Sequence, residues 1–437
     1  MKALSRRTFV TRTAAGATAV AASTALAANA GAASTAFTAP KVIRSQDSST
    51  EITFYHIWGT PPGGEEKETK HPSQQVIDAF NAKNTGVTVN GQTPSGDYYE
   101  VLQKAQADMA AGNPPALVIT PWASINYANE GLGVISLEEI GGDETAGVLA
   151  NIKETVLPLV QLEDKTVGLP YAFSCPIVYY NNDVLKQAGV DPAVMLKDWA
   201  SFKTEGAKVQ SALNGNPILG IAYNKDWPAQ SLIQSNGGFI LDESGTPVMN
   251  SPEAIAAMQA IADLDQAGLY DRGTSKELRP SFVGGATAAY IGSVASLGGM
   301  RRDVAFDLQT ASFPVFAGMP RKMSSGGSFI GCYAQKDEQR KAAWEFLKFA
   351  ISEEGYKIWM QTGYLNASNY DIEHLEGQEA AYTQLDEGLT RETPWPGARG
   401  GELQATWGTY VERIWASDIS AEDGCNQAAD ELKSMIG

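Results

Sequence analysis

Segments with the patterns of strands and helices alternate from residue 51 onward, and this alternation constrains the fold more than any other feature of the sequence. The first stretch predicts strand, helix, strand, helix and strand at Glu51–Trp58, Pro72–Asn84, Gly86–Gly91, Asp97–Ala111 and Ala116–Thr120. The last of these strands is continuously apolar, as strands of buried parallel sheets are. Strands that alternate with helices in this way predict an α/β fold.

The alternation returns after residue 175 with different segment lengths. Strands are predicted at Pro176–Tyr180 and Ala286–Ile291. Helices are predicted at Asp183–Gly189, Asp198–Leu213, Pro252–Gly268, Asp337–Ile351, Glu353–Thr362, Ala405–Ala416 and Ala421–Ile436. At about 150 residues per domain, 437 residues have room for two or three domains. No linker rich in Pro, Gly and Ser marks off a third domain, so we expect two α/β lobes.

Residues 1–39 have the pattern of an export signal. They hold four basic residues and no acidic residue, and no charge occurs between Thr13 and Pro40. That stretch is rich in Ala, Thr, Gly and Ser, which makes it less apolar than a membrane span. The arginine pair in Ser5-Arg6-Arg7-Thr8-Phe9 resembles a twin-arginine signal, which directs the export of folded proteins. We therefore expect a soluble periplasmic or extracytoplasmic protein, without a lipid anchor because the first cysteine is Cys175.

The charge balance excludes two classes of partner. The sequence has 33 Lys+Arg against 50 Asp+Glu, a formal net charge of −17. Such an acidic protein repels nucleic-acid phosphates and anionic membranes, so neither is an expected partner. Cys175, Cys332 and Cys425 are too few and too scattered for a disulfide framework or a four-thiolate zinc site. We expect three buried free thiols. One disulfide between two of these cysteines stays open as the alternative.

Motifs of the common enzyme classes are missing from the sequence. There is no G-x-S-x-G elbow, no H-E-x-x-H pair, no G-x-x-x-x-G-K-[ST] loop and no strand-linked G-x-G-x-x-G. His56, His71 and His374 are far apart in the chain, which gives no sign of a metal site or a catalytic triad. We expect no catalytic residues, no metal and no cofactor. Catalysis by a pair of carboxylates, as in a glycosidase, stays open as an alternative, because no sequence motif would mark such a pair.

Aromatic residues and glycine-rich loops indicate binding instead. The chain has nine Trp, 16 Tyr and 43 Gly. Rings can stack on a polar ligand, and loop backbones can donate hydrogen bonds to it. A binding protein is therefore the leading hypothesis. A secreted glycoside or phosphodiester hydrolase is the alternative from another class, and an adhesion or scaffold protein is a third.

Several segments resemble, in the same order, the extracytoplasmic solute-binding proteins (family 1) of carbohydrate ABC importers. They are Gly96–Tyr98, Ala110–Val118, Gly168–Tyr171, Pro176–Asn182, Leu185–Gly189 with Trp199, Phe282–Ser293, Ala343–Phe349 and Thr362–Leu365. The resemblance implies the two-lobe periplasmic-binding-protein fold (type II), with a ligand cleft between lobes joined by hinge crossings. It also implies ABC permease subunits as partners of a monomeric protein. We place the N-terminal lobe at 50–173 plus 290–327, and the C-terminal lobe at 174–289 plus 328–437.

Within that family the likeness is greatest to glycerol-3-phosphate-binding proteins. Their ligand-binding positions match Tyr98, Ser174, Trp227, Ser293, Gly327, Tyr364 and Arg399. The match implies that Tyr98 contacts glycerol hydroxyls, and that the serines, Tyr364 and Arg399 hold a phosphate. Where the family pattern has a glutamate, this chain has Trp122, which implies a ring at the polyol end of the site.

The resemblance therefore implies a glycerol-3-phosphate-like ligand or a glycerophosphodiester, captured by hinge closure. A guanidinium suits such a ligand because it offers paired N–H donors to two phosphate oxygens. The ring of Trp122 keeps a second ligand class open, a non-phosphorylated sugar or oligosaccharide.

Overall fold

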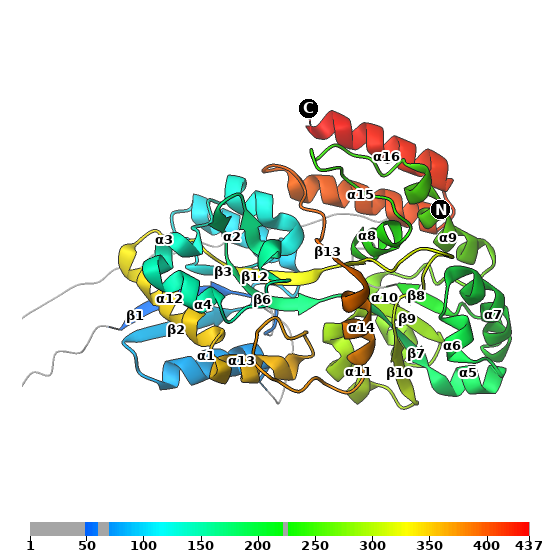
Figure 1. Cartoon of the computed structure of the whole chain (residues 1–437), viewed down its shortest axis with the longest axis horizontal. Coiled ribbons are helices and arrows are strands. Elements are labelled where there is room, and N and C mark those ends of the chain that lie inside the picture. Colours follow the sequence, from blue (N-terminus) through cyan, green and yellow to red (C-terminus); the bar gives the residue numbers. More distant parts are fainter. Residues whose placement is uncertain (1–48, 60–69, 222–225, 437) are drawn as a thin grey trace, which may run out of the picture. The chain divides into compact units, whose positions relative to one another are not determined.

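Two main β-sheets, each packed against helices, organise the protein (Figure 1). The computed structural model describes residues 49–59, 70–221 and 226–436. The export signal expected at residues 1–39 lies outside these residues. Within the three described ranges, no helix has the length and the apolar character that crossing a bilayer requires.

The first sheet has the strand order β2-β1-β3-β12-β6. Its strands are β1 (Thr50–Tyr55), β2 (Val87–Gln92), β3 (Leu117–Pro121), β6 (Leu169–Ser174) and β12 (Gly326–Cys332). Strand β1 is parallel to β2 and β3, whereas β12 is antiparallel to β3 and β6. The helices near this sheet are α1 (Pro72–Ala82), α2 (Tyr98–Ala110), α3 (Leu137–Gly141), α4 (Thr145–Leu149), α12 (Asp337–Ala350) and α13 (Glu353–Trp359).

The second sheet has the order β10-β7-β9-β8. Its strands are β7 (Pro176–Asn181), β8 (Leu219–Ile221), β9 (Ala289–Ser293) and β10 (Leu308–Ala311). Strand β9 is parallel to β8 and antiparallel to β7. The helices on this side are α5 (Asn182–Ala188), α6 (Pro192–Met195), α7 (Trp199–Ala212), α8 (Asp226–Ser235), α9 (Pro252–Gln266), α10 (Ser275–Val283), α11 (Leu297–Asp303), α14 (Glu379–Gly388), α15 (Gly400–Trp415) and α16 (Ala421–Ile436).

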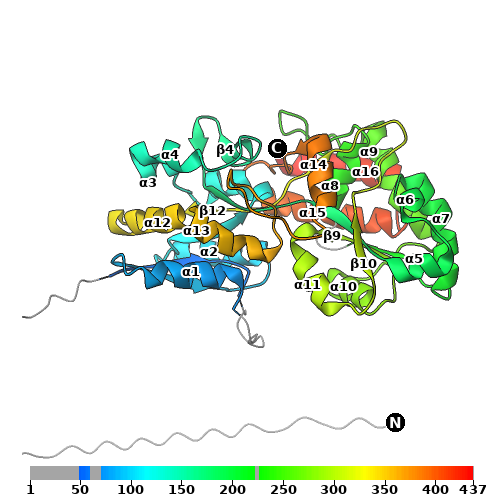
Figure 2. The same cartoon turned by 60° about the horizontal axis from the view of Figure 1, so that its bottom comes forward.

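Two small two-stranded sheets also occur among the residues that the structure describes. Strands β4 (Gln161–Leu162) and β5 (Lys165–Thr166) form an antiparallel pair. Strands β11 (Met323–Ser324) and β13 (Leu389–Thr390) form a parallel pair next to α8. Figure 2 shows the chain crossing between the two main sheets near β12 and β9.

Local sequence signals explain why the predicted elements form where they do. Asp97 caps α2 by accepting hydrogen bonds from the backbone N–H groups of Tyr99 and Glu100. Gly189 ends α5 with a φ of 66°, in the left-handed region that favours glycine. The predicted helix Ala421–Ile436 is confirmed at both ends, whereas α15 begins at Gly400 instead of Ala405.

The strand pairings differ from the lobe boundaries predicted from the sequence. Residues 290–327 were placed in the N-terminal lobe, but β9 pairs with β7 and β8 in the second sheet. Residues 328–437 were placed in the C-terminal lobe, but most of β12 lies after residue 327, and β12 is in the middle of the first sheet. The reason is that the chain returns to the first sheet only at Gly326, after completing β9 and β10.

The chain passes directly between the two sheets at one residue. Strand β6 ends at Ser174 and β7 begins at Pro176, so Cys175 alone links them. Its thiol is fully buried and accepts a hydrogen bond from Gln384 Nε2 at 3.0 Å. The other two cysteines are also buried and free, so the prediction of three buried free thiols is confirmed.

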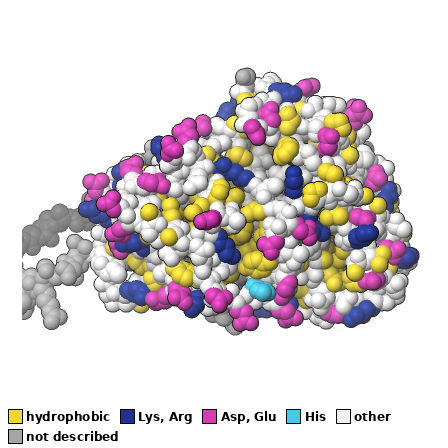
Figure 3. Space-filling view, viewed as in Figure 1, with side chains coloured by type: hydrophobic (Ala, Val, Ile, Leu, Met, Phe, Trp, Pro, Cys, Tyr) yellow, Lys and Arg dark blue, Asp and Glu magenta, His cyan; other side chains and the backbone are white. Residues whose placement is uncertain are grey.

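Charged side chains cover the molecule without sorting by sign on the face seen in Figure 3. Acidic and basic side chains are interspersed there, with hydrophobic side chains between them. Beneath the surface, one continuous hydrophobic core extends through both sheets, from Ile52 on β1 to Leu432 on α16. On the face seen in Figure 3, therefore, the negative charge is not gathered in one patch.

Candidate ligand-binding site

A cavity of about 430 Å³ lies between elements of the first sheet and elements of the second. Tyr98 begins α2, Ser174 ends β6 and Gly327 belongs to β12, all on the side of the first sheet. Trp227 on α8 and Ser293 at the end of β9 line the same cavity from the side of the second sheet. This volume is within the range of about 300–1,000 Å³ that small-molecule sites have.

Six of the eight residues predicted for the site line this one cavity. They are Tyr98, Ser174, Trp227, Ser293, Gly327 and Tyr364. These residues are far apart in sequence, between 98 and 364, and the two-sheet fold brings them together. The remaining two, Trp122 and Arg399, do not line it.

Phenol and indole groups form a connected cluster at one end of the cavity. The hydroxyls of Tyr98 and Tyr364 are 3.3 Å apart, and Trp58 Nε1 donates to Tyr364 Oη at 3.3 Å. Buried Ser328 donates to Tyr98 Oη at 3.1 Å, which fixes that ring from β12. Several hydroxyl groups therefore face a shared space, where they can donate to or accept from a ligand.

Glycines at the start of β12 let an indole ring and the neighbouring backbone approach closely. A Cβ on Gly326 would lie 2.1 Å from Trp227 Cζ2, so the ring packs directly on this glycine. Trp227 Nε1 donates to the carbonyl of Ser325 at 3.1 Å. Gly327 has a φ of 107°, and a Cβ there would lie 2.0 Å from the carbonyl oxygen of Ala172. Only glycine fits these two positions without moving the backbone or the indole.

Trp122 lies in the core, contrary to the expectation that it forms a wall of the site. It follows the fully buried strand β3, is itself 0% exposed, and its ring lies 6.1 Å from that of Phe329 on β12. Strand β12 pairs with β3 up to Pro121, the residue before Trp122, and Trp122 is not among the residues that line the cavity.

Arg399 lies at the surface, also contrary to expectation. Its guanidinium forms an ion pair with Glu402, three residues along α15, and donates to the carbonyl of Met435. These contacts hold it at the edge of a different cavity, beside the first. The reason is its position at the N-cap of α15, where the next helical turn supplies a carboxylate partner.

The structure adds lining residues that were not predicted, and two of them are acidic. Glu392 lines the cavity at 6% exposure, and Asp97 lies at its edge. Burial, together with the charge of Asp226, raises the pKa of Glu392 well above its usual range. Among the residues that the structure describes, no Lys or Arg lines this cavity. Glu392 belongs to an extended segment without periodicity, so no sequence pattern could have marked it.

Behind Glu392 a buried polar network joins α2, α8 and α15. Gln404 Nε2 donates to Asp226 Oδ2 at 2.7 Å, and the hydroxyl of Tyr99 donates to Gln404 Oε1. Gln230 donates to the same carboxylate at 3.3 Å. Burial raises the pKa of Asp226 to about 7. The network fixes the orientation of the Gln404 amide, which lines the cavity.

A stack of three rings stands beside the cavity in the first sheet. The ring of Trp58 lies 5.8 Å from that of His56 and 6.3 Å from that of His71, stacked with both. His71 lines the cavity and caps α1 by accepting a hydrogen bond from the N–H of Ser73. Burial lowers the pKa of His56 to about 3, so it is an uncharged core residue at neutral pH.

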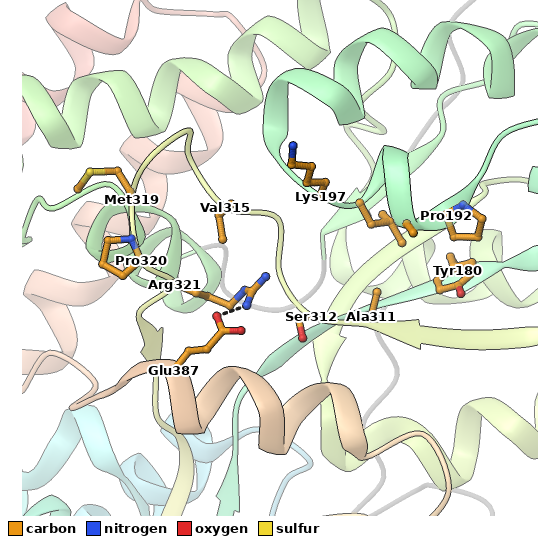
Figure 4. A pocket seen from close by; sticks show the side chains of 12 residues that line it. Tyr180, Pro192, Lys197, Ala311, Ser312, Val315, Met319, Pro320, Arg321 and Glu387 are labelled. Atoms are coloured by element: carbon orange, nitrogen blue, oxygen red, sulfur yellow. Dashed lines mark hydrogen bonds and ion pairs between the residues drawn. The ribbon is translucent and has the colours of Figure 1, made fainter.

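A third cavity, of about 580 Å³, lies beside the second sheet and holds none of the predicted residues. Figure 4 shows Arg321 and Glu387 joined by an ion pair, and Lys197 and Met319 line the same cavity. Its lining residues lie between Tyr180 and Glu387, outside the strands of the first sheet. The cavity between the two sheets is therefore the candidate site.

Comparison with known proteins supports the fold and gives the family. The family model for bacterial extracellular solute-binding proteins matches residues 75–381. The glycerol-3-phosphate-binding periplasmic protein UgpB of Pectobacterium atrosepticum is 26% identical over 421 residues, which cover 89% of this chain and 92% of that protein. Its counterpart in Yersinia pseudotuberculosis is 24% identical over 354 residues, which cover 77% of this chain and 78% of that protein.

Solved structures show the same arrangement of elements. UgpB from Mycobacterium tuberculosis, in complex with glycerophosphocholine, matches with a TM-score of 0.76 at 21% identity, covering 89% of this chain and 98% of that one. An ABC substrate-binding protein from Listeria monocytogenes, in complex with cycloalternan, matches with a TM-score of 0.76 at 18% identity, covering 89% and 99%. The predicted two-lobe α/β fold is thereby confirmed, and this chain belongs to the family of bacterial extracellular solute-binding proteins.

Proposed function

We propose that this protein captures a small polyhydroxylated solute in the cavity between its two sheets and delivers it to an ABC importer. One observation carries the proposal: six residues chosen for ligand binding, from widely separated segments, line a single cavity of suitable volume. Hydroxyl groups of Tyr98, Tyr364, Ser174 and Ser293, with the ring of Trp227, offer the contacts that such a solute needs.

A glycerol phosphate ester or glycerophosphodiester is the first ligand class. The relatives named as glycerol-3-phosphate-binding proteins support this class, because they match most of this chain. Serine and tyrosine hydroxyls can donate to phosphate oxygens without a metal ion. The glycerol hydroxyls can donate to Glu392 or to the phenol oxygens.

A non-phosphorylated oligosaccharide is the second ligand class, and a specific observation favours it. The described lining holds the acidic residues Asp97 and Glu392 but no Lys or Arg. A phosphate dianion placed there would lack a full positive charge to offset the loss of its hydration. A neutral sugar meets no such cost, and the ring of Trp227 offers a surface for stacking.

Binding by hinge closure follows from where the lining residues lie. Each half of the cavity belongs to a different sheet, so a ligand that contacts both halves stabilises the closed form. A permease that recognises the closed form would then accept loaded protein in preference to empty protein. We take the two sheets with their helices as the two lobes, and the protein as a monomer exported through its twin-arginine signal.

Calorimetry on the purified protein tests the function. The panel contains glycerol 3-phosphate, a glycerophosphodiester, maltose and maltotetraose. Tight binding of a member, with the ligand recovered chemically unchanged after incubation, supports capture without catalysis. Turnover of the ligand would favour the hydrolase, and no binding by any member would contradict the proposal.

Export is tested separately in a bacterial host. Replacing Arg6 and Arg7 by lysine keeps the charge but removes the arginine pair, so the full-length protein should stay inside the cell. Export of the variant at the normal level would contradict the twin-arginine route without touching the binding proposal.

A further inference from the structure

A second cavity adjoins the candidate site. It has a volume of about 690 Å³ and lies between α2 and α15, with Ser124 and Tyr127 at one side. Three residues line both cavities: Asp97, Tyr99 and Gln404. The two spaces therefore lie on opposite sides of the same small group of side chains.

The pair that separates the cavities comes from two different helices. Tyr99 is on α2 and Gln404 is on α15, and the tyrosine hydroxyl donates to the amide oxygen of the glutamine. The amide nitrogen of Gln404 is in turn held by Asp226 on α8. A contact between side chains from separate helices opens by rotamer changes or by a small relative movement of the helices, without unfolding a backbone element.

The lining of the second cavity sets the chemistry of what fits it. It carries the carboxylates of Glu100, Glu402 and Glu412 and the amides of Gln103 and Gln106. The one guanidinium among the described lining residues, that of Arg399, is paired with Glu402. Negative charge is therefore unfavourable here, whereas hydroxyl groups can donate to carboxylate and amide oxygens.

We propose that the ligand is elongated and occupies both cavities, passing the Tyr99–Gln404 pair, with an uncharged, hydroxyl-rich part in the second cavity. The inference rests on the proposed function and narrows its substrate class. It selects an oligosaccharide, or a glycerophosphodiester with a polyol headgroup, over a monosaccharide or glycerol 3-phosphate. The first cavity holds one end of the ligand and the second cavity holds the rest.

A helix glycine allows the second cavity to be filled without touching the first. Gly408 on α15 lines only the second cavity, and a Cβ added there meets no atom within 4 Å. Gly408→Phe therefore projects a ring into that space without an initial backbone clash. Ala405→Trp, on the same exposed side of α15, blocks the space from a second position. Gly147→Phe on α4 is the matched control, because it is equally open and lines neither cavity.

The test compares short and long members of two ligand series by calorimetry. The pairs are maltose with maltotetraose, and glycerol 3-phosphate with glycerophosphoinositol. In the parent protein and in Gly147→Phe, we expect a long member to bind at least about tenfold more tightly than its short partner. Gly408→Phe and Ala405→Trp should remove that advantage, while a thermal melt shows that both variants are folded.

The outcomes separate this inference from the proposed function. Equal affinity for the short and long members, with no effect of either blocking variant on their ratio, would overturn the inference and leave the function standing. No binding by any of the four probes would overturn the proposed function itself, and the inference with it. A long-ligand advantage that both blocking variants leave intact would also overturn the inference.

Discussion

Gln404 on α15 donates a hydrogen bond of 2.7 Å to the buried carboxylate of Asp226 on α8, directly behind the candidate site. The carboxylate also accepts from Gln230, but among the described residues no basic side chain offsets its charge. Hydrogen bonds from these side-chain amides replace only part of the hydration that the carboxylate loses on folding. The position is therefore sensitive to pH.

Replacing Asp226 by asparagine should stabilise the protein at neutral pH. The folded pKa of Asp226 is raised from 3.8 to about 7, so its contribution to stability is full below pH 3.8 and declines as the pH rises through 7. Asp226→Asn removes this decline and should raise the free energy of unfolding at pH 7 by at most about 4 kcal/mol. Urea denaturation at pH 4 and pH 7 measures the difference, which should be small at pH 4.

Asp307, whose pKa is lowered instead of raised, provides the control. Gln309, Lys186 and Asn182 donate to Asp307, and these contacts lower its pKa to about 2. Asp307→Asn should therefore reduce stability at pH 7 and change it less at pH 2. If Asp226→Asn lowered stability at pH 7 as Asp307→Asn does, the account of the Asp226 site would be wrong.

His56 should contribute to unfolding in acid. Its folded pKa is lowered from 6.5 to about 3, so the unfolded state binds more protons between these values. Its contribution to stability is present above pH 6.5 and is lost as the pH falls towards 3. His56→Asn, which can still accept from the N–H of Trp58, should reduce the drop in melting temperature between pH 7 and pH 4. An unchanged drop in His56→Asn would contradict this account of His56.

Gly327 should tolerate no larger side chain. Alanine there would adopt a φ of 107° and place its Cβ 2.0 Å from the carbonyl oxygen of Ala172. Gly327→Ala should lower the free energy of unfolding by at least about 2 kcal/mol, measured by urea denaturation. Gly298→Ala on α11, where a Cβ meets nothing within 4 Å, should be neutral or slightly stabilising. Similar behaviour of the two variants would contradict the geometry described at β12.

Tyr364 should matter more than Arg399 for a ligand confined to the first cavity. The hydroxyl of Tyr364 faces that cavity beside Tyr98 and Trp58, so Tyr364→Phe should weaken such a ligand by about two- to tenfold. Arg399 is paired with Glu402 outside the first cavity, and Arg399→Ala should weaken the same ligand less. Calorimetry with maltose or glycerol 3-phosphate measures both, and a larger loss in Arg399→Ala would reverse the assignment.

The sequence predicts elements whose signals are local and misses those that depend on distant partners. Helix α2 was predictable because Asp97 caps it and its apolar residues repeat at helical spacing. Strand β12 was not predicted because Gly326, Gly327 and Gly331 interrupt the strand pattern in its sequence. Its place in the sheet comes from β3 and β6, which lie more than 150 residues earlier. The strand pairings differ from the predicted lobe boundaries for the same reason.

The candidate site was predictable to the extent that the backbone places its residues. Tyr98, Ser174 and Ser293 stand at the ends of secondary structure elements, so their positions follow from the fold. Trp122 was misplaced because its direction depends on Phe329, a distant neighbour that sequence order does not supply. Arg399 was misplaced because α15 was expected to begin at Ala405, so the pairing of Arg399 with Glu402 at the start of the helix was not expected. Glu392 was missed because it is buried in a segment between β13 and α15 that has no repeating pattern.

The single residue between β6 and β7 limits how the two halves of the protein can move. Cys175 is enclosed, and Gln384 ties both its sulfur and the carbonyl of Pro176 to α14. A connection of one residue that is held by these hydrogen bonds allows rotation about a few backbone bonds. It does not allow one sheet to slide past the other. When the cleft opens, the residues that lie farthest from Cys175 must therefore move the greatest distance.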